Sequence, residues 1–209
     1  MMNLNHNHVI LCGTVAAHPT YSHESYGRDF YRMELQVCRL PGTVDQIPVL
    51  VDSKTLETVR AEQGCRLKVY GSMRSVNYTT ENHRKLVLFV FAQRVEETEE
   101  QDSNQIILTG TLCKPAVLRS TPFGRLITDL LLAVGRPNSS GRSDYLPCVA
   151  WGRLAKQTYL MHMGGTVTLR GRVQSRAYTK VVDGIEETRT AYEVSVMELI
   201  GHESMPAAA

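Results

Sequence analysis

The chain has 209 residues, of which 43% are hydrophobic and 21% charged, and its formal net charge is +2. These values are typical of a folded globular protein of one or two domains, since domains usually contain about 100–150 residues. No apolar run approaches the roughly 20 residues that a membrane helix needs. Residues 1–8 also lack the basic and then apolar order of a secretory signal. We therefore expect a cytoplasmic protein without membrane contact.

Cysteines and histidines give no sign of a metal site or of catalysis. The five cysteines are scattered without a C-x-x-C pair and most lie among apolar residues, which predicts reduced core thiols. His6 and His8 have no further ligands at short spacing, so we expect no metal. The seven histidines accompany no nucleophile motif, and neither a P-loop nor an H-E-x-x-H motif occurs. We predict that the protein is not an enzyme and has neither catalytic residues nor a cofactor.

The sequence contains an internal repeat. Residues 7–15 (NHVILCGTV) reappear as residues 104–112 (NQIILTGTL), and residues 64–71 (GCRLKVYG) match residues 164–171 (GGTVTLRG). Shorter matches lie between them, and the offset drifts only from 96 to 100. This period is too long for a solenoid, so the repeat predicts a duplicated domain.

Charge is distributed in agreement with two domains. Residues 1–95 carry 11 Lys and Arg against 8 Asp and Glu, whereas residues 96–103 (EETEEQDS) carry 5 acids and no base. Residues 104–209 carry 12 bases against 8 acids. We predict domain 1 over 1–95, a solvated acidic linker over 96–103, domain 2 over 104–200 and a short C-terminal tail over 201–209.

The order of elements predicts an all-β fold with one short helix in each domain. In the first copy the helix position falls on residues 53–63. In the second copy we expect strands, a helix that ends at two glycines, and a long hairpin with its turn at residues 182–184. Three strands, a helix and a hairpin are the order of a five-stranded OB-fold Greek-key barrel. The predicted elements of this copy are strands 106–112, 126–134 and 145–151, helix 152–163, and strands 166–178 and 190–200.

The second copy resembles the bacterial single-stranded DNA-binding protein (SSB) family. No single motif is decisive, but their order and spacing make the match specific, and they span nearly all of this copy. The resemblance implies that single-stranded DNA lies over OB barrels, with bases stacked on Tyr145, Trp151 and Tyr178 and phosphates held by basic side chains. The stretches that carry it are 104–112, 115–124, 132–136 (LAVGR), 144–153 (DYLPCVAWGR), 171–180 (GRVQSRAYTK) and 189–194 (RTAYEV).

Strand alternation agrees with this resemblance. Tyr145, Val149 and Trp151 share one face of their strand, opposite Leu146, Cys148 and Ala150. An exposed aromatic pair can stack bases of any sequence. A row of arginines on strand 166–178 lies beside Tyr178 and suits phosphate neutralisation. Core aromatics and a solvated sheet face are the alternatives. The candidate DNA-binding residues are Tyr145, Trp151, Tyr178, Arg153, Arg170, Arg172, Arg176, Lys180, Arg125, Arg136, Tyr78 and Arg74.

The first copy lacks part of this pattern. Gln46 stands where the second copy has Tyr145, and Asp52 stands where it has Trp151. We expect a weakened stacking platform that keeps part of the DNA path through Tyr78 and basic side chains (Arg66, Lys68 and Arg74) and otherwise serves assembly. The resemblance implies pairing of subunits through the first strand, and two chains would bring four barrels together as a homodimer.

These observations predict sequence-independent binding of single-stranded DNA in replication, repair or recombination. The family commonly carries an acidic, aromatic C-terminal tip, which residues 201–209 (GHESMPAAA) lack, so we do not expect recruitment of replication enzymes through such a tip. One alternative is a primosomal or recombination accessory protein that acts as an adaptor. The other is an OB module that binds proteins or oligosaccharides.

Overall fold

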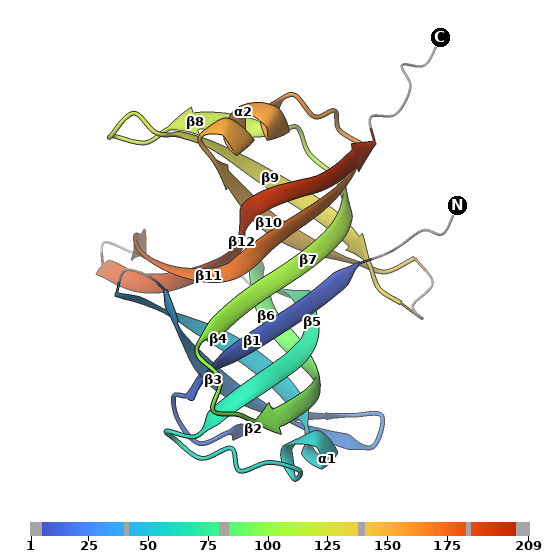
Figure 1. The fold of residues 1–209 in the computed structure, drawn as a ribbon, viewed down its shortest axis with the longest axis vertical. Helices are drawn as coiled ribbons and strands as arrows, with labels where there is room; N and C mark the ends of the chain where they lie inside the picture. The colour runs from blue at the N-terminus through green and yellow to red at the C-terminus, as the bar shows by residue number, and fades with distance from the viewer. Residues whose placement is uncertain (1–5, 40–41, 80–83, 138–140, 183–184, 204–209) are drawn as a thin grey trace.

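The chain folds into two β-barrels stacked along the long axis of the molecule (Figure 1). The computed structural model describes residues 6–39, 42–79, 84–137, 141–182 and 185–203, and this part contains 12 strands and two short helices. The elements are β1 (Asn7–Val15), β2 (Thr20–Ser25), β3 (Arg28–Arg39), β4 (Thr43–Asp52), α1 (Ser53–Leu56), β5 (Arg66–Thr79), β6 (Arg84–Glu97), β7 (Ser103–Leu112), β8 (Val117–Ser120), β9 (Leu126–Gly135), β10 (Ser143–Trp151), α2 (Arg153–Tyr159), β11 (Thr166–Val182) and β12 (Ile185–Glu203).

Strand order confirms the predicted tandem OB barrels. Barrel 1 contains β1 to β6, and barrel 2 contains β7 to β12 in the same arrangement. Each barrel closes through a short parallel pairing, β4 with β6 and β10 with β12. The described part has six strands in each barrel rather than five, because the short strands β2 and β8 pair with β3 and β9. The turn expected at residues 182–184 falls partly on residues 183–184, outside the described residues.

Both helices are shorter than their sequence patterns predict. In barrel 1 the helix ends at Leu56, and the next two backbone hydrogen bonds, from Thr58 and Val59, span three residues rather than four. The residues that follow include the β-branched Thr58 and Val59, which have low helix propensity, and Val59 and Ala61 pack against the core without continuing the helix. In barrel 2 the helix begins after Gly152, whose φ of 58° is easily adopted by glycine, and ends at Tyr159.

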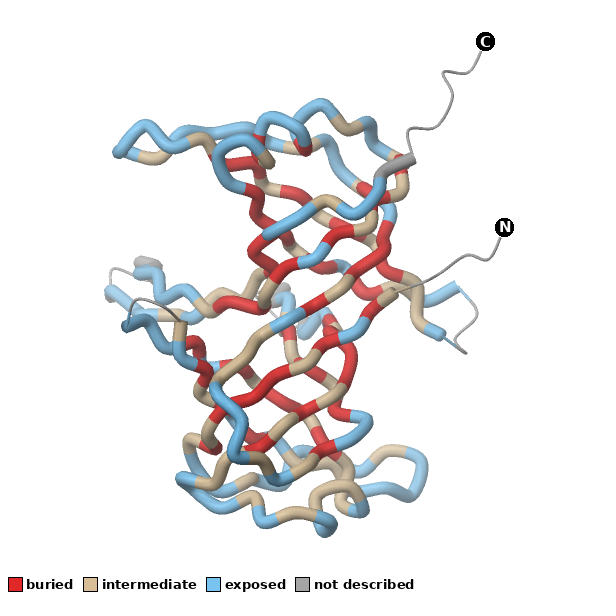
Figure 2. Tube along the Cα trace, viewed as in Figure 1, coloured by how far each residue is buried: buried red, intermediate tan, exposed pale blue. Residues whose placement is uncertain are grey.

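The core is formed by alternate side chains of the strands. In β1 these are Val9, Leu11 and Val15, and in β7 they are Ile106, Leu108 and Leu112, all almost fully buried. Buried residues run through both barrels and across the seam between them, whereas the outer loops are exposed (Figure 2). Each fully buried aliphatic side chain contributes about 1.5–3 kcal/mol.

The two barrels join at a seam formed by β1 and β7. These strands pair antiparallel with Val9 opposite Ile106, and Asn7 and Leu11 lie opposite Leu108 and Asn104. The repeat makes Asn7 equivalent to Asn104 and Leu11 equivalent to Leu108, so the register is that of a local two-fold axis. The first strand was expected to pair subunits. It instead pairs with the second copy of itself in the same chain, because the short linker brings that copy alongside.

The acidic linker lies against barrel 1. Asp102 accepts a hydrogen bond from the Cys38 amide (2.7 Å) and pairs with Arg66 (2.7 Å), while Glu100 pairs with Lys68 (2.7 Å). Burial alone would raise the pKa of Asp102, but the hydrogen bonds from Cys38 and Arg66 outweigh it and lower that pKa. The segment was expected to be solvated, and none of its residues is buried, yet two of them are also held by partners on barrel 1. Its partners lie more than 30 residues away in sequence, on β3 and β5, and hold it beside the seam.

Each long hairpin requires a glycine at the point where its two strands approach each other most closely. Gly71 and Gly171 lie at register shifts in β5 and β11. A Cβ atom added to Gly171 would collide with the carbonyl oxygen of Ser195, and one added to Gly71 would collide with that of Phe91. Since backbone atoms cannot move aside as flexible side chains do, these strands pack at this distance only with glycine.

We therefore expect Gly171→Ala to lower the free energy of unfolding by about 1–3 kcal/mol. Urea denaturation followed by circular dichroism measures this change. Gly201→Ala in β12 is the matched control, because no atom lies within 4 Å of the point that an added Cβ would occupy, and it should leave stability nearly unchanged. Equal stability of both variants would contradict the close approach.

Candidate nucleic-acid interface

Two aromatic rings project outward from β10. Tyr145 is 43% exposed and Trp151 40% exposed, whereas the intervening Leu146, Cys148 and Ala150 are buried. The predicted orientation of both rings is thus confirmed. Val149 differs, since it lies in mid-strand between β9 and β12 and is buried. At about 3.3 Å per residue, the two rings are about 20 Å apart along the strand, a separation that suits two different bases rather than one.

Basic side chains surround Trp151. A hollow of about 680 Å³ on one side is lined by Arg125, Arg153 and Lys156 together with Trp151. A second hollow, of about 550 Å³, lies between Trp151 and β11 and is lined by further arginines. Arg125 and Arg153 belong to the predicted set, but Lys156 does not. The sequence could have indicated Lys156, because it follows Arg153 by three residues on α2 and so lies one helical turn away on the same face.

The arginine row of β11 is divided among different environments. Arg170 forms an exposed ion pair with Glu198 (3.0 Å). Arg176 lies over the ring of Tyr178, with 5.9 Å between the guanidinium carbon and the ring centroid, and Tyr178 is 37% exposed. Arg172 is only partly exposed. Lys180 belongs to β11, but its side chain lies outside the described part of the structure.

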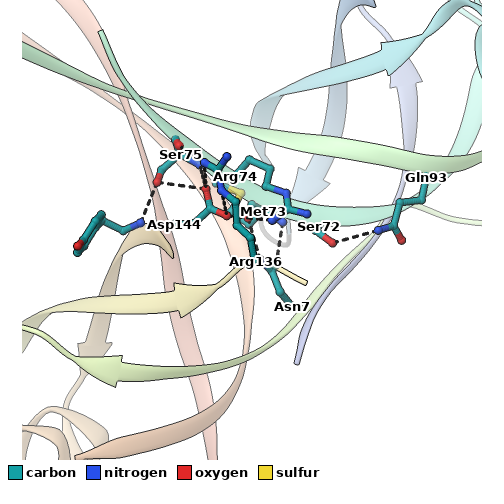
Figure 3. A network of polar contacts seen from close by, with 9 residues as sticks. Asn7, Ser72, Met73, Arg74, Ser75, Gln93, Arg136 and Asp144 are labelled. Carbon is teal, nitrogen blue, oxygen red and sulfur yellow. Dashed lines mark hydrogen bonds and ion pairs between the residues drawn. The ribbon is translucent and has the colours of Figure 1, made fainter. Parts of the chain in front are cut away.

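Arg74 and Arg136 lie in the interface between the barrels. Both guanidinium groups contact the fully buried carboxylate of Asp144, Arg74 at 3.0 Å and Arg136 at 2.7 Å (Figure 3). The same carboxylate accepts a hydrogen bond from the Ser75 amide (2.7 Å). Binding of DNA by these two arginines stays a prediction, and the structure gives them a structural role. Strand alternation could not reveal this role, because Asp144 lies 70 residues from Arg74.

Barrel 1 carries a different aromatic surface. The carboxylate of Asp52, which replaces Trp151, caps α1 by accepting from the Thr55 amide (3.0 Å). A groove of about 350 Å³ opens instead on the outer side of the barrel, between β2, β4 and the β5–β6 hairpin. Tyr78, 62% exposed, and Phe89 are its main aromatic rings. Its lining residues are Ser22, His23, Arg32, Pro48, Val49, Leu50, Val76, Tyr78, Val87 and Phe89.

Comparison of the two sequence copies did not predict this groove, because Phe89 has no aromatic counterpart in the second copy. The strand registers place Glu193 at the corresponding position of barrel 2. Asp129 likewise corresponds to Arg32, and it pairs with Arg119. The available signal was the alternation of β6, in which Leu88, Val90 and Ala92 are buried and Phe89 is on the opposite face.

The described residues contain no group of three or more His, Cys, Asp or Glu side chains arranged to hold a metal ion. The described cysteines are free thiols, and burial raises the pKa of the Cys148 thiol. No described helix is long and apolar enough to span a membrane.

Fold and surface together define a class: a tandem OB-fold protein that presents exposed aromatic rings among arginines. The wild-type single-stranded DNA binding protein from Thermus aquaticus shares this fold, with a TM-score of 0.76, 23% identity, and coverage of 97% of this chain and 96% of that one. A profile of the Single-strand binding protein family matches residues 103–200.

Sequence relatives specify the family. Single-stranded DNA-binding protein B of Bacillus subtilis (strain 168) is 39% identical over 80 residues, which cover 36% of this chain and 71% of that protein. Single-stranded DNA-binding protein A of the same strain is 36% identical over 80 residues, 36% of this chain and 46% of that protein. The match thus spans about half the length of most of these relatives. The chain belongs to the single-strand binding protein family.

The Asp144 network leads to a prediction about stability. Asp144→Asn leaves two partly buried guanidinium groups without their carboxylate, and breaking a buried pair in this way costs about 3–5 kcal/mol. Asp129→Asn, in an exposed pair with Arg119 on the same barrel, should cost about 0–1 kcal/mol. Chemical denaturation of both variants measures the difference, and similar losses would show that the network does not hold the barrels together.

Proposed function

We propose that this protein binds single-stranded DNA without sequence preference and thereby protects it during replication, repair or recombination. The observation that carries this proposal is the exposed pair Tyr145 and Trp151 on an otherwise buried strand, with arginine-lined hollows on both sides of Trp151. Stacking on an aromatic ring contributes about 1–3 kcal/mol per base and tolerates every base. Membership of the family and the names of its relatives support the same function.

The proposed path of the strand runs along barrel 2. One base stacks on Tyr145 and another on Trp151, and the phosphates between and beyond them meet Arg125, Arg153 and Arg176. Tyr178 then offers a ring on the hairpin. Binding through phosphates releases counterions, so affinity should fall steeply with salt concentration.

The same proposal includes the oligomeric state of the protein and its cellular compartment. One chain supplies two barrels about a local two-fold axis, and two chains would supply four. We propose a cytoplasmic homodimer that binds DNA and catalyses no reaction. Since the β1–β7 seam is used within the chain, the dimer contact lies on another surface. Sedimentation equilibrium with and without oligonucleotide measures the number of chains.

The first test of function uses Trp151, the single tryptophan. Its fluorescence should be quenched by oligo-dT. Trp151→Ala and Tyr145→Ala should each raise the Kd for a labelled oligo-dT, measured by anisotropy, by roughly 5- to 150-fold. Trp151→Phe should restore most of the affinity. Tyr159→Ala, on α2, is a control outside the path. Unchanged affinity in both alanine variants would contradict stacking on β10.

A second test concerns the groove of barrel 1. We propose that it holds a further stretch of the strand, since Tyr78 and Phe89 offer rings and Arg32 offers a cation. The double variant Tyr78→Ala/Phe89→Ala should shorten the length of oligo-dT at which affinity saturates while leaving quenching of Trp151 intact. If length dependence is unchanged, the groove lies outside the DNA path and serves a protein contact, as an adaptor would.

A further inference from the structure

A hollow of about 680 Å³ lies between the C-terminal end of α2 and the paired ends of β11 and β12, at one end of the molecule (Figure 1). Aliphatic and methionine side chains make up half of its lining. Two of them are well exposed, Leu160 at 74% and Ile200 at 49%. Large apolar side chains that are exposed together around a concave surface indicate a binding site for another apolar group.

The hollow carries almost no charge. Among the described residues that line it, His162 is the only one whose side chain can be charged. The two hollows beside Trp151 are instead lined by arginine and lysine. Phosphates bind where cations neutralise them. The hollow behind α2 therefore suits an uncharged, apolar segment of polypeptide and not a nucleic acid.

The corresponding end of barrel 1 is closed by the chain itself. Val59, after α1, packs against the core, and Glu97 at the end of β6 accepts a hydrogen bond from the Arg60 amide (2.8 Å). The residues that follow stay on the same barrel, where Glu100 pairs with Lys68 (2.7 Å). In the first copy, the segment after the last strand thus covers its own barrel.

The segment after β12 differs in chemistry, and so does the surface beside it. In barrel 1 the Thr98 amide donates to the Arg66 carbonyl (3.2 Å), and in barrel 2 Glu203 is the strand partner of Thr166. The repeat makes Thr166, which lines the hollow, equivalent to Arg66. Counting two residues onward places Met205 where the first copy has an acid. An acid paired with a cation in barrel 1 is therefore replaced in barrel 2 by an apolar residue near an uncharged wall.

We propose that the segment after Glu203, residues 204–209 (SMPAAA), docks in this hollow with Met205 as its anchor and closes the end of barrel 2. The segment starts at the wall of the hollow, because Glu203 pairs with Thr166, and each extended residue adds at most about 3.3–3.6 Å of reach. Pro206 restricts the preceding Met205 to extended backbone conformations, which reduces the entropy lost on docking. A methionine side chain also adapts well to an irregular apolar space.

Docking at this place supports α2 from its C-terminal end. The same short helix carries Arg153 and Lys156, which line the hollow beside Trp151 at its other end. The docked segment lies outside the proposed path of DNA, so the proposal does not rest on the proposed function. Loss of docking and loss of DNA binding are separate observations.

A variant that ends at Glu203 and the point variant Met205→Asp test the proposal. The first removes the segment, and the second places a charge against apolar walls. Each should lower Tm by about 3–8 °C and increase the fluorescence of the apolar dye ANS, which binds to exposed hydrophobic surface. Ala209→Asp, which adds the same charge at the other end of the segment, is the matched control and should leave both readings unchanged. If the shortened variant and Met205→Asp melt as the unchanged protein does, the proposal is overturned.

A second measurement locates the docked segment. Leu160→Ala should lower Tm in the full chain but have little effect in the variant that ends at Glu203, because the two changes remove the same contact. An equal loss in both backgrounds shows that the segment does not contact this hollow and overturns the proposal. Sedimentation equilibrium of Met205→Asp adds a further check. A loss of dimers in this variant shows that the segment docks on a second copy of the chain, which also overturns the proposal, whereas an unchanged number of chains supports docking within one chain.

Discussion

The position of one barrel relative to the other depends on two buried aspartates that accept hydrogen bonds across the boundary between the barrels. Asp45 of barrel 1 accepts a hydrogen bond from the Ser175 amide, and Asp144 of barrel 2 accepts one from the Ser75 amide. The hydroxyl of each serine in turn accepts from a backbone amide of the other barrel. A buried carboxylate is costly unless it is paired. The repeated exchange, with the β1–β7 seam, therefore sets one relative orientation of the barrels.

That fixed orientation allows the two copies to differ in what they present to solvent. Barrel 2 keeps Tyr145 and Trp151 on β10. Barrel 1 uses Asp52 at the equivalent of Trp151 as a helix cap and gathers its rings, Tyr78 and Phe89, around a groove instead. Both copies thus keep buried, apolar side chains at equivalent interior positions, because both must fill a barrel core, while the outer faces diverge.

The local two-fold axis also shows where the chain is asymmetric. Arg74 and Arg136 both pair with the buried carboxylate of Asp144, whereas Arg172 and Arg176, on the side of Asp45, line a hollow beside Trp151. A symmetric pair of barrels would have two equivalent sites. This chain instead uses the two sides differently: one pair of arginines holds the barrels together, and the other lines the hollow beside Trp151.

The sequence by itself determined the duplication, the all-β barrels and the outward orientation of Tyr145 and Trp151, because a repeat and strand alternation are local properties of the chain. It also indicated the family through the order of short motifs. Only the tertiary structure decided that Arg74 and Arg136 face Asp144, that the linker is held against barrel 1, and that Arg39 of barrel 1 reaches Gln174 of barrel 2. Those contacts join residues mostly 30 to 135 apart in sequence. Alternation tells which face a side chain lies on, but the residue across that face is set by how the two barrels pack.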